Sequence, residues 1–291
     1  MPLFQAVAFF DNYPTLDPAA LRDAILSCDP EGKNLPCAAT AVEERTELPE
    51  ELVPLKAAHP EFRMAEGALR LGDMEMQLRL HNTPAPHADC IRASLLSPEE
   101  KQRLQRHKAF GLLTLADTGA SPAIERLIFL LKAGLALTHQ GAIGIGNEIN
   151  MTAFTREILD ETLKDWTDQG DSLWRSLRQE GIPVELLVNF FLTNLHGENW
   201  CFSAGHELFG FPDFACRVER PSDLEDIQNA FYNGFLVMFE SGEPIESGEV
   251  FGGEEGEEGA PQFRFDAPTL DQEYLLQDNG ILVITRVGEE G

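Results

Sequence analysis

Four side chains that could do chemistry lie within about twenty residues of one another: His196, Cys201, His206 and Cys216. Imidazole nitrogen and thiolate sulfur are ligands that zinc accepts. The spacing is loose, however, and His206-Glu207 is not followed by a second histidine at the metalloprotease spacing. Structural zinc sites carry tightly paired ligands. The sequence therefore predicts no metal and no cofactor here, and it favours cysteines that pack as small apolar residues.

The same stretch leaves open an alternative, a hydrolase-like enzyme with a pocket around His196, Cys201, His206 and Asp213. Cys201 would be the nucleophile, a histidine its base, and Asp213 or Asn199 would orient that base. A catalytic triad is recognised by its geometry. The alternative therefore requires these side chains to converge on one concave and partly exposed site.

Two further motifs depart from the patterns that carry chemistry. Gly141, Gly144 and Gly146 form G-x-x-G-x-G, whereas the dinucleotide fingerprint is G-x-G-x-x-G. Ser203 lies in F-S-A-G and lacks the glycine two residues earlier that a nucleophile elbow needs. Neither a dinucleotide-binding loop nor a serine nucleophile is therefore expected. The three glycines instead indicate a strand that another backbone approaches closely.

Aromatic residues crowd the segment from 187 to 218, where they alternate in a way that favours a packed core. An exposed subset would instead mark a surface for a partner. The residues in question are Phe190, Phe191, Trp200, Phe202, Phe209, Phe211 and Phe214.

Charge restricts the possible partners. The 291 residues include 49 acidic and 22 basic side chains, for a formal net charge of −27. This opposes nucleic-acid binding, which relies on Lys and Arg contacts to phosphate, and docking on anionic lipid. A basic protein, in contrast, would be attracted and steered. No Lys, Arg or His occurs between Pro221 and Phe263.

The cysteine usage and the hydropathy indicate a cytoplasmic protein. The five cysteines are odd in number and form no C-x-x-C pair. The first residues, MPLFQAVAFFDNYP, lack the basic start and cleavage site of a signal peptide. No apolar run reaches the roughly 18 residues that span a bilayer. We expect a reduced protein outside the membrane.

Apolar periodicity and turn signals predict strands and helices that mix throughout the chain. Strands are expected at 4–10, 37–42, 110–115, 141–149, 184–195, 200–203, 213–218 and 281–287, with a hairpin or one bent strand over 68–80. Helices are expected to begin at Asp17, Ser97 and Ser121, to span 152–180, and to run from Asp223 to about Glu240. His196 to Asn199 is expected to be a four-residue turn, and Glu254 to Gly259 a mobile loop tip.

These elements predict an α+β fold with mixed, largely antiparallel sheets and packed helices. Two sheet-forming halves are expected, an N-terminal half over 1–150 and a C-terminal half over 151–291, unless the chain forms one continuous domain.

The succession ALTHQGAIGIGNEIN, LVNFFLTNLHGENWCFSAGHELFGFPDFACRV and LVMFESGEPIESGEV resembles the DUF4261 family of bacterial proteins. The likeness runs from about Ile124 to Val250. It implies a bacterial cytosolic protein and no catalytic residues. Proteins of such families can accompany secreted toxins as immunity or accessory factors, which is an association of class.

The leading hypothesis is a non-catalytic, acidic binding protein, such as an immunity-type or accessory factor that neutralises a toxin or effector. Its partner would be another protein with a basic region. The residues expected to contact that partner are Trp200, His206, Phe209, Asp213, Glu254 and Glu255. The oligomeric state is left open.

Overall fold

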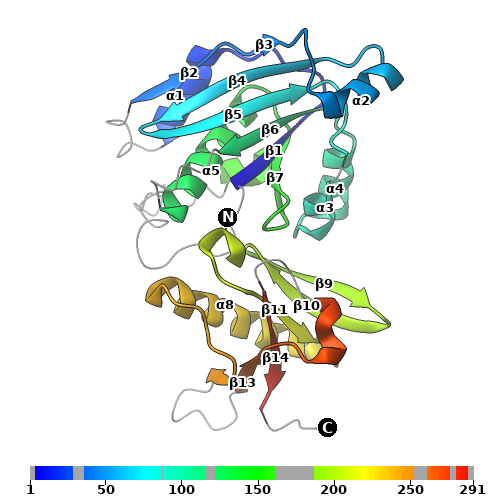
Figure 1. The fold of residues 1–291 in the computed structure, drawn as a ribbon, viewed down its shortest axis with the longest axis vertical. Coiled ribbons are helices and arrows are strands. Elements are labelled where there is room, and N and C mark those ends of the chain that lie inside the picture. Colours follow the sequence, from blue (N-terminus) through cyan, green and yellow to red (C-terminus); the bar gives the residue numbers. More distant parts are fainter. Residues whose placement is uncertain are drawn as a thin grey trace. The chain divides into compact units, whose positions relative to one another are not determined.

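The computed structural model describes residues 4–28, 36–86, 88–115, 122–161, 187–251, 261–275 and 280–287 (Figure 1). Within them the fold is α+β with two largely antiparallel sheets, as the sequence predicts. Residue contacts divide the chain into two compact units, Leu3–Pro183 and Val184–Gly291.

The first unit is built on a sheet in which every described pairing is antiparallel. Its order is β2-β4-β5-β6-β1-β7-β8, and β3 also pairs with β4. The strands are β1 (Phe4–Phe10), β2 (Cys37–Ala39), β3 (Glu43–Glu44), β4 (Met64–Leu71), β5 (Met74–His81), β6 (Ala109–Leu115), β7 (Gly144–Asn147) and β8 (Thr152–Thr155).

Helices cover both faces of this sheet. Gly134 of α5 lies against Ile145, which pairs with Ala8 on one face. α3 and α4 share a buried cluster with Val7 and Phe9 on the other. The helical segments of the unit are α1 (Pro18–Cys28), η2 (Glu50–Leu52), α2 (Val53–Ala58), α3 (Asp89–Ala93), α4 (Pro98–Gln105) and α5 (Ala123–His139).

Two predicted helix starts are confirmed by their caps. Asp17 Oδ1 accepts a hydrogen bond from the Ala19 backbone N–H at 2.9 Å. Ser97 forms a capping box with Glu100, in which each side chain accepts from the other residue's backbone N–H. Such caps satisfy amide groups that have no partner within the helix.

The structure confirms the glycine-rich strand β7, and it also confirms that neighbouring atoms approach its glycines closely. A Cβ on Gly144 would lie 2.5 Å from the carbonyl oxygen of Phe154 on β8, and one on Gly146 would lie 2.6 Å from Cys90 Sγ. These glycines let β8 and α3 pack against β7.

The second unit has a sheet of order β12-β13-β14-β11-β10-β9. Its strands are β9 (Asn189–Leu195), β10 (Glu198–Ala204), β11 (Asp213–Arg217), β12 (Glu249–Phe251), β13 (Phe263–Asp266) and β14 (Ile281–Arg286), and its helical segments are η4 (His206–Phe209), η5 (Pro221–Asp223), α8 (Leu224–Ser241) and η6 (Leu270–Leu275). β11 and β14 are parallel, and the other described pairs are antiparallel. The chain leaves β11 through α8 before it returns as β14.

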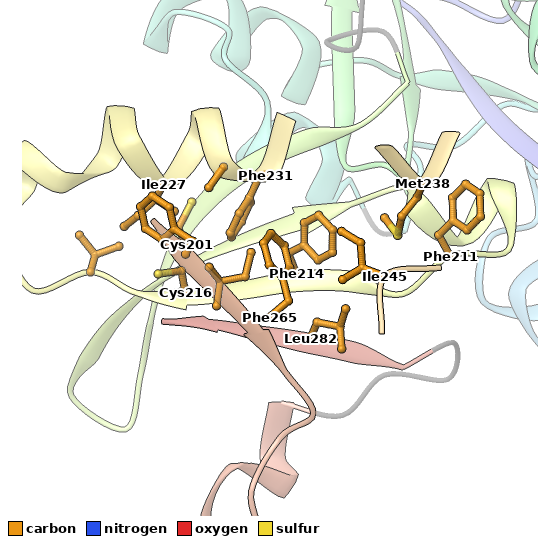
Figure 2. Packing of buried hydrophobic residues seen from close by; sticks show 14 residues of the cluster. Cys201, Phe211, Phe214, Cys216, Ile227, Phe231, Met238, Ile245, Phe265 and Leu282 are labelled. Carbon is orange, nitrogen blue, oxygen red and sulfur yellow. The ribbon is translucent and has the colours of Figure 1, made fainter. Parts of the chain in front are cut away.

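α8 covers one face of this sheet, where it buries a cluster of aromatic, aliphatic and cysteine side chains (Figure 2). The helix residues Ile227, Phe231 and Met238 are at most 2% exposed, as their helical spacing predicts. Gly234 brings α8 close, because a Cβ there would lie 3.0 Å from the ring of Phe214. The opposite face buries Trp200, Phe202, Ala215, Ile281 and Val283 together with Leu275 of η6.

The structure corrects three expectations. The turn between β9 and β10 has two residues, His196 and Gly197, both with positive φ (53° and 86°), whereas four were expected. Thr152–Thr155 is a strand, and the predicted helix beyond 161 lies outside the described residues. β12 and β13 were not expected, because each is short and flanks a Gly/Glu-rich segment.

Among the described residues, no helix combines the length and the apolar character that a bilayer crossing would need.

Replacing Gly144 by Ala should lower the free energy of unfolding by about 1–3 kcal/mol, because the new methyl group would collide with a backbone oxygen that cannot move aside. Gly111→Ala in β6 is the control: its Cβ would meet the end of the Leu80 side chain at 3.1 Å, which can shift. Urea unfolding of both variants measures the difference, and equal effects would contradict the explanation.

Candidate functional site

The structure separates the residues of the alternative hydrolase-like pocket. His196 lies in the β9–β10 turn, where its ring packs edge-on against Tyr274 with centroids 4.8 Å apart. Cys201 is fully buried in the cluster beneath α8. His206 and Asp213 do meet, but their exposed fractions are 0% and 4%. The four side chains therefore do not converge on one open site.

His206 and Asp213 belong to a buried hydrogen-bond network with Ser203. The Ser203 hydroxyl donates to Asp213 Oδ1 at 3.0 Å and accepts from the Phe214 backbone N–H at 2.7 Å. The His206 backbone N–H donates to Asp213 Oδ1 at 3.3 Å. His206 Nδ1 lies 2.9 Å from the carbonyl oxygen of Pro212. Because that carbonyl only accepts, Nδ1 carries the ring proton.

This proton arrangement differs from that of a catalytic triad. A triad needs a histidine nitrogen that accepts the proton of the nucleophile. Here the Ser203 hydroxyl donates its hydrogen bond to Asp213, and the nearest His206 nitrogen, 3.4 Å away, is already protonated. The rings of Phe214 and Phe235 pack against His206 with centroids 4.6 and 5.0 Å away. The network ties the segment between β10 and β11 to α8.

Burial shifts the pKa values of both ionisable members of the network. It lowers the pKa of His206 to about 4, and it raises the pKa of Asp213 to about 7 although the Ser203 hydroxyl stabilises the charged form. Desolvation disfavours the ion in each case. Both groups are therefore neutral at mildly acid pH.

Cys201 and Cys216 occupy directly opposed positions on β10 and β11. Burial raises the pKa of both thiols to about 12, so neither forms the thiolate that a nucleophile or a zinc ligand requires. No cluster of three His, Cys, Asp or Glu side chains suited to a metal ion occurs in the described parts of the chain.

The residues expected to contact a partner differ in how far the structure exposes them. Trp200 is 2% exposed, and the half-buried ring of Phe209 packs against Phe235 and Phe239. His206 and Asp213, being buried, offer a partner no surface. Glu254 and Glu255 lie outside the described residues.

A pocket with a volume of about 670 Å³ lies in the second unit, at the carboxyl ends of the parallel strands β11 and β14. Its walls come from the end of β14, the start of β10, the first turn of α8 and η6. In α/β sheets this end of parallel strands is where ligands bind. Five acidic and two basic side chains line it: Glu198, Glu219, Asp223, Asp226 and Asp271, with Arg217 and Arg286.

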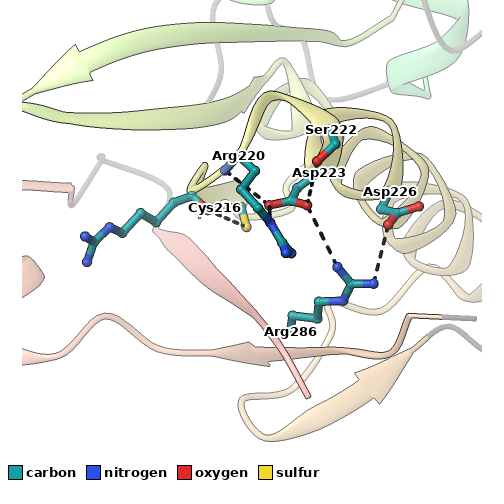
Figure 3. A network of polar contacts seen from close by, with 7 residues as sticks. Cys216, Arg220, Ser222, Asp223, Asp226 and Arg286 are labelled. Carbon is teal, nitrogen blue, oxygen red and sulfur yellow. Dashed lines mark hydrogen bonds and ion pairs between the residues drawn. The ribbon is translucent and has the colours of Figure 1, made fainter. Parts of the chain in front are cut away.

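Arg286 of β14 lies between two carboxylates of the α8 start (Figure 3). Its Nη1 is 4.0 Å from Asp223 Oδ1 and its Nη2 is 3.7 Å from Asp226 Oδ2. Asp223 also accepts a hydrogen bond from Arg220 Nε at 3.1 Å, and this contact holds the pKa of its carboxyl below the ordinary range. Arg217 pairs with Glu198 at 3.2 Å across β10 and β11.

The charges of the pocket favour a cation. Five carboxylates against the two guanidinium groups of the lining and that of Arg220, which pairs with Asp223, leave a formal surplus of two negative charges. The amino end of a helix such as α8 attracts anions, but its effect is equivalent to only about half a charge. An anionic ligand would therefore be repelled, whereas an ammonium or guanidinium group would be held.

Aromatic rings form one side of the pocket. The indole of Trp200 and the ring of Tyr274 meet edge-on, with centroids 6.5 Å apart, and both line the cavity. Within the described structure, the buried Trp200 Nε1 has no hydrogen-bond partner. Leaving such a donor without an acceptor costs about 1–3 kcal/mol. Trp200, which was expected at a partner surface, is thus a buried residue that lines the pocket.

Sequence reasoning missed this pocket because its walls come from segments that are far apart along the chain. One signal was present. The N-cap of α8 is Asp223 and its first turn carries Glu225 and Asp226, inside the stretch from Pro221 to Phe263 that has no basic residue.

Asp213→Asn should change how stability depends on pH. Between pH 3.8 and about 7 the folded protein keeps a proton on Asp213 that the unfolded chain releases, so this group makes stability fall as the pH rises. His206 acts oppositely between pH 6.5 and about 4, where protonation of the unfolded chain makes stability fall as the pH drops.

The side-chain amide introduced by Asp213→Asn would keep the acceptor without titrating, so the variant should gain stability relative to the native protein from pH 5 to pH 8. Urea unfolding at both pH values measures this, and Asp11→Asn controls for the loss of one negative charge. A stability difference that does not change with pH would show that the Asp213 carboxyl is ionised throughout.

No family model, curated protein or solved structure matches this chain. The resemblance to DUF4261 accordingly stays a prediction.

Proposed function

We propose that this protein is a non-catalytic, acidic binding protein that takes a basic segment of another protein. The observation that carries the proposal is the pocket at the ends of β11 and β14, with its surplus of carboxylates beside two aromatic rings. Carboxylates hold ammonium and guanidinium groups, and aromatic faces attract the same cations.

The charge of the whole chain supports the same partner. A net charge of −27 would steer a basic protein towards the surface and raise the association rate, most strongly at low salt. An immunity-type or accessory factor that neutralises a toxin or effector is the case in which the basic segment belongs to the toxin. In that role the protein would act in the cytoplasm of a bacterium.

The hydrolase-like alternative receives no support from the geometry. Its base and orienting carboxylate, His206 and Asp213, are enclosed by aromatic rings, and its thiol, Cys201, is buried and protonated. A substrate would need to reach these groups, and a nucleophile needs a lowered pKa.

A short lysine-rich peptide with a fluorescent label should bind, and its affinity should fall as salt is added. The double change Asp226→Asn with Asp271→Asn should weaken binding about 2- to 30-fold, because exposed charge pairs are worth about 0.2–1 kcal/mol each. Fluorescence anisotropy measures both effects.

The matched control removes two exposed carboxylates of the first unit, by Glu99→Gln with Glu161→Gln, for the same change in net charge. Its affinity should stay close to that of the native protein. Equal losses for the two double variants would mean that only the overall charge attracts the peptide. Failure to bind at low salt would refute the proposal.

A further inference from the structure

The pocket contains an internal example of what its carboxylates hold. One guanidinium group, that of Arg286, has one Nη directed to Asp223 and the other to Asp226, three residues later on the same helix face (Figure 3). Residues three apart on a helix are neighbours. The two carboxylates are thus spaced to face the two amino groups of a planar fork, which lysine does not have.

Further carboxylates extend this arrangement towards the aromatic side. Asp271 of η6 is exposed, and Glu198 of β10 lines the same cavity. Of the two, Glu198 already pairs with Arg217, so the exposed Asp271 is the carboxylate open to a guanidinium group that enters from solvent. Such a group could also stack on Tyr274, since arginine packs on aromatic faces more readily than lysine does.

The second feature of the pocket is the indole N–H of Trp200, which can donate a hydrogen bond, whereas the carboxylates can only accept one. The indole of Trp200 is 2% exposed and lines the pocket, and its N–H finds no acceptor among the described residues. A bare cation could not use this N–H. A ligand that carries a carbonyl oxygen as well as a guanidinium group would satisfy both the carboxylates and the indole.

We propose that the pocket recognises an arginine residue within a peptide: the carboxylates bind the guanidinium group, and the Trp200 N–H donates to a backbone carbonyl oxygen of the ligand. This rests on the proposed function and specifies its ligand. The indole N–H is buried in this structure, so the carbonyl reaches it only when a neighbouring side chain moves; the ring of Tyr274, 43% exposed and edge-on to the indole, is the neighbour that would have to move. The ligand removes the cost of an unpaired buried donor.

The experiment uses the full chain and three small probes. N-acetyl-arginine amide carries both recognised groups. N-acetyl-citrulline amide has the same shape without the charge, and propylguanidine has the charge without the carbonyl groups. Two-dimensional NMR of protein labelled with ¹⁵N follows the indole N–H resonance of Trp200, which Trp200→Phe identifies by its loss.

The arginine probe should bind and move the Trp200 indole proton downfield, as a new hydrogen bond does. The citrulline probe should not bind measurably. Propylguanidine should bind about 5- to 150-fold more weakly than the arginine probe, because the cost of the unpaired indole donor remains, and it should leave the indole proton in place. Asp226→Asn should weaken both charged probes, which tests the guanidinium contact without touching the core.

The outcomes separate this inference from the proposed function. If the lysine-rich peptide binds but the arginine probe leaves the indole resonance unmoved, the function stands and the ligand assignment is wrong. Equal binding of citrulline and arginine probes would likewise overturn the assignment. If no basic peptide binds, both proposals fail.

Discussion

The second unit depends on the parallel pairing of β11 with β14. Two parallel neighbours cannot be joined by a tight turn, so the chain must cross back to the opposite end of the sheet before the second strand begins. α8 is the longest element of this connection, which also contains β12, β13 and η6, and its aromatic stripe covers one face of the sheet. Because α8 starts where β11 ends, its first turn lies beside the carboxyl end of β14. The acidic pocket follows from this connection.

A second set of hydrogen bonds lies at the amino end of β11, opposite the end where the chain leaves for α8. Ser203, His206 and Asp213 close the segment between β10 and β11 with a network that stays neutral at mildly acid pH. Within the described structure, the network satisfies the Ser203 hydroxyl and His206 Nδ1 but leaves the buried His206 Nε2 without a partner, which reduces its contribution to stability. Two residues of the candidate catalytic set, His206 and Asp213, thus form structural hydrogen bonds at the start of β11.

The sequence was a good guide to elements whose signals are local. The strand Phe4–Phe10, the helix caps at Asp17 and Ser97 and the buried stripe of α8 follow from periodicity and capping chemistry, and the structure has them. The pocket was out of reach, since Trp200, Asp226 and Arg286 are brought together only by strand order and register. The Ser203 network was missed for a different reason: its members are close in the sequence, but their spacing does not show which nitrogen of His206 holds a proton.

The edge strand β9 shows another role for the negative charge. Among the strands that the structure describes in the second unit it stands at the end of the order, and Leu192 on it is 54% exposed. An unpaired strand edge with apolar side chains is a template on which a second copy can add. Mutual repulsion between copies that each carry a large negative charge opposes such growth. Solutions of this protein should therefore turn turbid as acid brings it towards its isoelectric point, where this repulsion is lost.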